Sequence, residues 1–198
     1  MNILSISSKQ KLFLIFLVIS FSFFAWVIQI IFIGKLRLAH VCANLPLTII
    51  IVTGLVANFN YPKENPNEIK RISLGQVVKN QFKNGSISGL FLGLFLASIE
   101  KSLTGVLPIA YPLVGFLAGY FSLGNFSLPV FLIIPLVFMF SVLAQAIFSL
   151  ELFFLHVNGV FNHLINFAMI EASINALIAP FVYFPINAIY EYWINMEK

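Results

Sequence analysis

The chain has 198 residues, of which 60% are hydrophobic and 9% are charged, and its formal net charge is +4. A soluble domain typically carries about 25% charged residues, so this composition argues against a water-soluble protein and predicts an integral membrane protein. The cations lie between apolar segments, where they set topology and contact anionic lipid headgroups, so the net charge does not indicate a nucleic-acid partner.

Apolar segments of spanning length recur along the chain. A transmembrane helix needs about 20 predominantly apolar residues, and in lipid only helices satisfy every backbone group internally within one segment. The sequence therefore predicts an all-α fold: a single domain that is a polytopic transmembrane helix bundle of about six spans. The predicted spans lie near residues 12–33, 41–59, 84–100, 105–121, 128–150 and 169–190.

Three of these segments leave alternatives open. The first, residues 12–33, is longer than the roughly 7–15-residue core of a signal peptide, so we expect it to be retained as a span. The segments at 84–100 and 105–121 are short; they are compatible with a re-entrant pair, but we favour two spans that use flanking residues. Residues 152–167 carry histidines and asparagines, which favours an amphipathic or interfacial helix before the last span.

The distribution of cations predicts the topology. With six spans and a cytoplasmic N-terminus, eight of the 11 Lys and Arg residues lie on the cytoplasmic side and three on the other side. The positive-inside rule then predicts that both termini, and the polar loop at residues 60–83, are cytoplasmic. Apolar residues at helical spacing within the loop suit a short helix on the anionic leaflet. A solvated loop whose charges only set the topology is an equally good interpretation.

Glycines four residues apart mark two helix faces on which another backbone can approach closely. We therefore expect helix packing at five positions: Gly85, Gly89, Gly93, Gly115 and Gly119.

Acidic residues in or beside the apolar segments are the other candidates for function, because intramembrane ionisable groups are rare and costly. Glu100, Glu151 and Glu171 are the candidates for polar interactions, and for Glu151 and Glu171 a position at the membrane surface is favoured. No nucleophile elbow, phosphate-binding loop or metal-ligand motif occurs, so the sequence predicts no enzyme, no catalytic residue, no cofactor and no metal site.

Three stretches resemble the family of the bacterial rod shape-determining protein MreD. Gly85-x3-Gly89-x3-Gly93-Leu94, followed by Leu103-Thr104-Gly105, is similar to that family's Gly-rich segment. Leu113-Val114-Gly115-Phe116-Leu117-Ala118-Gly119-Tyr120 is similar to its next helix, and Asn175-Ala176-Leu177-Ile178-Ala179-Pro180-Phe181-Val182-Tyr183-Phe184-Pro185 to its closing helix. In this chain Ala97 occupies the position of the family's acidic residue, and the nearest acid is Glu100.

The resemblance implies a non-enzymatic subunit of the cell-elongation machinery in the bacterial inner membrane. Its partners would be an MreC-like membrane-anchored protein and, through it, MreB and the peptidoglycan synthases, within the lipid bilayer. The alternative is the substrate-binding subunit of an energy-coupling-factor vitamin transporter, another class of small six-helix proteins. A vitamin site needs convergent polar groups, of which the sequence offers few.

Overall fold

The computed structural model describes residues 41–56, 89–101, 108–121 and 130–195, together with individual positions between residues 16 and 29. These residues are almost entirely helical and include no β-strand, which confirms the prediction of an α-helical protein. The elements are α2 (Leu45–Val56), an unlabelled helix at residues 89–101, α4 (Ala110–Tyr120), α5 (Val130–Phe154), α6 (Val160–His163), the π-helical segment η2 (Leu164–Ala168) and α7 (Met169–Asn195).

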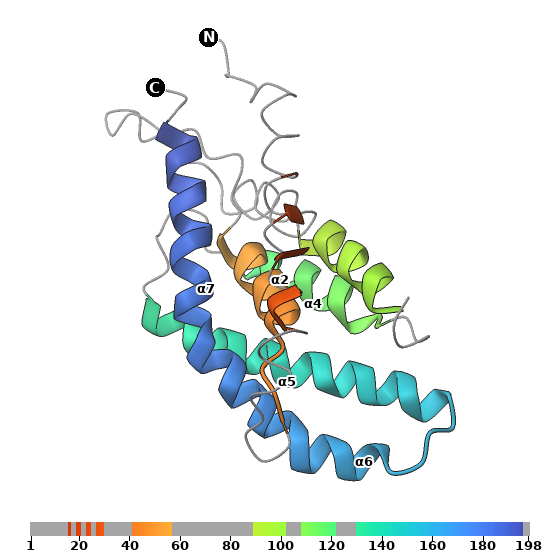
Figure 1. Ribbon diagram of the computed structural model, residues 1–198. Helices are drawn as coiled ribbons and strands as arrows, with labels where there is room; N and C mark the ends of the chain where they lie inside the picture. The colour runs from red at the N-terminus through yellow and green to blue at the C-terminus, as the bar shows by residue number, and fades with distance from the viewer. Residues whose placement is uncertain are drawn as a thin grey trace, which may run out of the picture.

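Helix α2 is the centre of the bundle. Its residues from Leu45 to Leu55 are all buried. A helix that is apolar on every side needs neighbours on every side, and α2 packs against α4, α5 and α7 (Figure 1). The core that these helices share consists of aliphatic side chains together with Phe140, Tyr111 and Tyr183.

Helix α5 and the returning run through α6 into α7 form a helical hairpin; in Figure 1 α5 lies along the base, and α7 crosses it and rises at the left. A Schellman motif ends α5: the N–H of Val157 donates to the carbonyl of Leu152 at 3.1 Å, and the N–H of His156 to that of Phe153 at 3.0 Å. His156 has a φ of 57°, the left-handed conformation that this motif requires and that glycine usually supplies.

The chain returns from this turn as one long helical run. The four-residue α6 passes through the π-helical η2 directly into α7, which contains Pro180 and Pro185. Residues 152–167 therefore do not form the separate helix expected from the sequence. This segment is divided between the last turn of α5, the connecting turn and the start of the returning helix, because the Schellman motif ends α5 within its first six residues.

Two helical runs, Phe131–Phe154 and Val160–Ile189, are long and apolar enough to cross a membrane. They overlap most of the predicted spans at 128–150 and 169–190 and extend beyond them toward the turn. Helices α2 and α4, with 12 and 11 residues, are shorter apolar helices within the predicted second and fourth spans. Most of the first predicted span and the loop at 60–83 lie outside the described residues.

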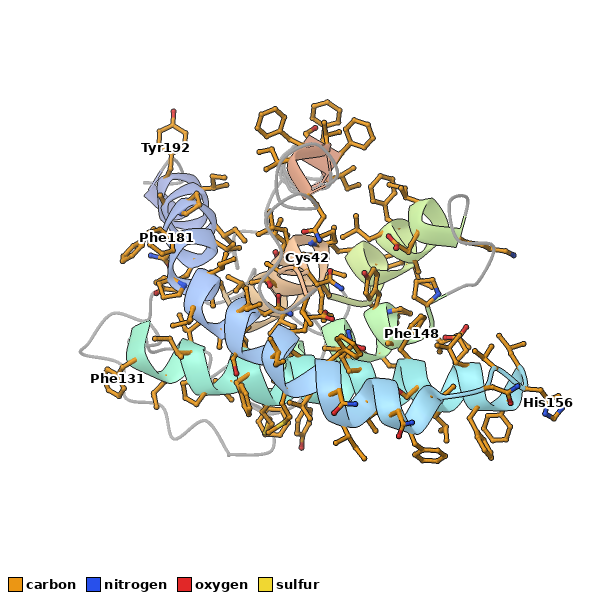
Figure 2. All side chains as sticks on the ribbon, turned by 60° about the horizontal axis from the view of Figure 1, so that its bottom comes forward. Cys42, Phe131, Phe148, His156, Phe181 and Tyr192 are labelled. Atoms are coloured by element: carbon orange, nitrogen blue, oxygen red, sulfur yellow. The ribbon has the colours of Figure 1, made fainter. Side chains whose placement is uncertain are left out.

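Large apolar side chains cover the outside of the hairpin. Figure 2 shows Phe181 and Tyr192 projecting away from α7, and Phe131 and His156 at opposite ends of α5. Phe181 is 76% exposed and Phe131 70% exposed. An apolar surface of this kind marks contact with lipid or with another protein.

Candidate functional site in the bundle interior

Glycines bring the helix at residues 89–101 into backbone contact with α4. A Cβ atom added at Gly89 would lie 2.9 Å from the Gly115 Cα and closer still to the Gly115 carbonyl group. A Cβ added at Gly93 would lie 2.5 Å from the Cα of Pro112. Since any side chain at these positions would overlap the facing backbone, this helix pair depends on glycine.

Helix α2 joins the same contact from another side. A Cβ atom added at Gly54 would lie 3.0 Å from the Gly115 carbonyl oxygen and 3.1 Å from the backbone nitrogen of Gly119. Gly115 and Gly119 are both buried in α4. The two glycines of α4 therefore face neighbouring helices and are turned away from the exterior.

A second kind of contact centres on Asn175, which is 0% exposed. Its Oδ1 accepts the backbone N–H of Asn44 at 2.7 Å, and its Nδ2 donates to the Ser141 hydroxyl at 3.3 Å. The Asn44 side chain caps α2 by accepting the N–H of Leu47 at 3.1 Å, and its Nδ2 donates to the Tyr111 hydroxyl at 3.2 Å. Asn175 thereby connects α7 to α5 and to the start of α2, and Asn44 extends the connection to α4.

Gln29 completes the cap of α2. Its Oε1 accepts the N–H of Leu45 at 2.8 Å, and its Nε2 donates to the carbonyl of Ala43. The Leu45 N–H and the Ala43 carbonyl have no partner within the helix, and they lie at the N-terminus of a buried helix, where an unpaired N–H is costly. A residue of the predicted first span therefore contributes to the same polar region.

Glu171 lies one turn before Asn175 on α7 and is turned into the bundle. Its Oε2 accepts a hydrogen bond from Gln145 Nε2 at 2.7 Å, and its Oε1 is buried without a hydrogen-bond partner among the described residues. The side-chain amides of Asn44 and Asn175 lie close to the same carboxyl group. Glu171, a candidate for polar interactions, therefore makes one inside the bundle, and its expected position at the membrane surface stays a prediction.

The buried polar residues of α5 share one helix face, and two of them, Ser141 and Gln145, bond to Asn175 and Glu171. Ser141, Gln145 and Ser149 are four residues apart, and all three are buried. We call the connected group the polar seam; it comprises Asn44, Tyr111, Ser141, Gln145, Glu171 and Asn175. It runs between α5 and α7 to the first residues of α2 and α4.

The other two acidic candidates lie outside the polar seam. Glu151 is half-buried near the end of α5, and its Oε2 accepts the backbone N–H of Ile109, at the start of α4, at 3.3 Å. Because a helix N-terminus favours negative charge, this carboxylate stabilises α4 and holds its first turn beside the end of α5. Glu100 is half-buried in the last turn of the helix at residues 89–101.

The remaining candidates are placed as follows. Gly85 and Gly105 lie outside the described residues. Pro180 and Pro185 are half-buried inside α7, where each removes one helical N–H donor.

Sequence reasoning did not single out Ser141, Gln145 and Gln29. The signal for the first two was their spacing of four within an apolar segment, which places them on one face, and Asn44 before an apolar run is a typical N-cap. Their partners could not be read from the sequence, because pairing depends on the register between α5 and α7.

Chemically, the polar seam offers amide, hydroxyl and carboxyl groups. In the part of the chain that the structure describes, no group of three His, Cys, Asp or Glu residues is placed to hold a metal ion. Comparison with protein families, with characterised proteins and with solved structures finds no match. Function must therefore be argued from the bundle itself.

Proposed function

We propose that the chain is a non-enzymatic, multi-pass subunit of the bacterial inner membrane that resembles MreD and supports cell elongation through helix contacts with a membrane-anchored partner. The observation that carries the proposal is the inverted polarity of the α5–α7 hairpin. Its polar residues Gln145, Glu171 and Asn175 face inward and bond to each other or to the bundle, while Phe131 and Phe181 face outward. Such a surface meets its partners in lipid.

The residues on which the resemblance rests have definite structural positions, which supports the proposal. Gly89, Gly93 and Gly115 lie where helix backbones touch, and Asn175 is the buried link between helices. A family of interaction subunits would need these positions to keep the bundle in shape. The link to MreD itself rests on the sequence motifs.

The proposal includes six spans with both termini in the cytoplasm. In that topology α4 begins and α5 ends on the non-cytoplasmic side. The hydrogen bond between Ile109 and Glu151 supports this, because it joins the start of α4 to the end of α5. Reporter fusions at the C-terminus test the topology. Activity of a cytoplasmic reporter is expected; activity of a periplasmic reporter would require an odd number of spans.

The function is tested in a rod-shaped host. A tagged chain, purified in detergent, should bring down an MreC-like protein with one membrane anchor, and depletion of the chain should round the cells. Phe181→Ala removes an outward ring without touching the core and serves to map the contact. Normal shape and wall synthesis after depletion would contradict the proposal.

The polar seam favours a second candidate, the substrate-binding subunit of a vitamin transporter, because it gathers more convergent polar groups than the sequence suggested. A thermal-shift screen with vitamins separates the two. A ligand-specific rise in melting temperature, together with loss of uptake of that vitamin on depletion, would replace the first proposal.

A further inference from the structure

The carboxyl group of Glu171 uses only part of its hydrogen-bonding capacity. Oε2 accepts one bond from Gln145, whereas Oε1 is shielded from solvent and accepts none from the described residues. A carboxylate oxygen has room for two donors. A buried polar atom without a partner is uncommon enough in native proteins to require an explanation.

The surroundings of Glu171 supply no balancing charge within the described part of the chain. From α5 it meets Gln145, and from the start of α2 it meets Asn44, both uncharged. In α4 the titratable group that interacts electrostatically with Glu171 is Tyr111, which also interacts with Glu100 of the helix at residues 89–101. Tyr111 and Glu100 carry no positive charge in any protonation state, so neither of them neutralises Glu171. An uncompensated carboxylate inside a helix bundle is strongly unfavourable.

The polar seam around Glu171 also contains oxygen atoms, the ligand type that a small hard cation prefers. These are the side-chain oxygens of Asn44, Asn175, Ser141 and Tyr111, each of which already accepts a hydrogen bond in the structure. The π-helical η2 ends at Ala168, one turn before Glu171. Such π-turns inside helices frequently occur at functional sites.

We propose that Glu171 is the binding site of a small monovalent cation in the bundle interior, held at Oε1 within the polar seam. Two sources can supply this positive charge, a proton and an alkali ion such as sodium. The site goes beyond the partner contact proposed above and does not depend on it. It makes the packing of α5 against α7 responsive to the ion content of the medium.

The test uses the full-length chain purified in detergent. Its melting temperature is measured over a sodium chloride series, with choline chloride holding the ionic strength constant, and separately over a pH series. Since a ligand that binds only the folded state stabilises it, wild type should melt several degrees higher with added sodium or at lower pH. A sodium response identifies the alkali ion, and a pH response alone identifies the proton.

The Glu171→Gln variant keeps the shape of the side chain but removes its charge, so its melting temperature should lose the response. Glu151→Gln, which alters a carboxylate outside the polar seam, is the matched control and should keep the wild-type response to sodium at constant ionic strength. A wild type indifferent to both series would overturn the proposal, as would a Glu171→Gln variant that responds like wild type.

If Glu171→Gln does not fold, infrared difference spectroscopy on wild type still decides. Adding sodium, or changing pH, should alter the bands of a carboxyl group that is protected from rapid hydrogen–deuterium exchange. Spectra in which only exchangeable, solvent-exposed carboxyl groups respond would refute a buried cation site.

Discussion

The contact between the helix at residues 89–101 and α4 and the contact between α5 and α7 join helices by opposite means. At the first, the backbones of the two helices touch at Gly89 and Gly115, because neither residue has a side chain to keep them apart. At the second, the side chains of Asn175 and Glu171 bond to polar side chains of α5. Small residues and polar side chains are the two devices that hold helices together in lipid, where the hydrophobic effect between helices is missing.

The two contacts therefore tolerate different substitutions. A backbone contact has no room for an added atom, whereas a hydrogen-bonded contact fails when a specific donor or acceptor is lost. Substitutions that add volume should therefore damage the first region most, and substitutions that keep volume but remove polarity should damage only the second.

The largest effect is expected from Gly89→Ala. The added methyl group would overlap the Gly115 carbonyl, so the helices must separate, at a cost of about 3 kcal/mol or more in unfolding free energy. Folded yield in detergent, judged by size-exclusion chromatography, and melting temperature provide the measurement. Leu94→Ala is the control on the same helix, because Leu94 is exposed. An unchanged melting temperature for Gly89→Ala would show that the backbones are not in contact.

Asn175→Leu should have the next largest effect. It conserves volume approximately but leaves the buried N–H of Asn44 without its acceptor, which should cost about 2 kcal/mol. Asn166→Leu, at an exposed position in η2, is the matched control and should change stability little. Melting temperatures of both variants are compared, and equal values would mean that Asn175 carries no structural bond.

Glu151→Gln should have a smaller effect. The amide can still accept the N–H of Ile109, but the interaction of a full charge with the N-terminus of α4 is lost, so we expect a loss below about 1 kcal/mol. The measurement is the melting temperature as a function of salt. The difference between the variant and wild type should shrink at high salt, because screening weakens the charge; a difference independent of salt would argue against an electrostatic role.

The smallest effect on stability is expected from Phe181→Ala. This side chain faces outward, so its removal should change the unfolding free energy in detergent by less than about 0.5 kcal/mol. Val182→Ala, next to it and buried, should be clearly more destabilising. Similar losses for both variants would mean that the face of α7 carrying Phe181 is packed inside the fold.

The two regions also differ in how far the sequence predicts them. Glycines that are four residues apart can be seen within a single segment, so packing positions such as Gly89 and Gly115 can be predicted without knowing their partners. The polar seam needs the relative register of α5 and α7, which no single segment contains, and so the sequence does not single out Gln145 or pair Glu171 with it.

Helix ends show the same limit. The sequence places the end of the fifth span at residue 150, yet α5 continues to Phe154 and stops through a Schellman motif with His156 at the position usually taken by glycine. The local signal for this reversal is Asn158-Gly159, a dipeptide typical of turns, which stands just beyond the end of α5 and does not give the residue at which the helix stops. By contrast, the helical nature of the chain follows from apolar content and segment length alone.

The π-helical segment η2 has a consequence for how this chain could change during evolution. A π-turn closes over five residues, not four, and so holds one residue more than an α-helical turn in the same stretch of helix. Deleting a single residue between Leu164 and Ala168 would let an α-helix run through, and would rotate the preceding turn and its aromatic residues by about 100° relative to α7. One codon thus separates two orientations of the hairpin tip, with the interior around Asn175 left intact.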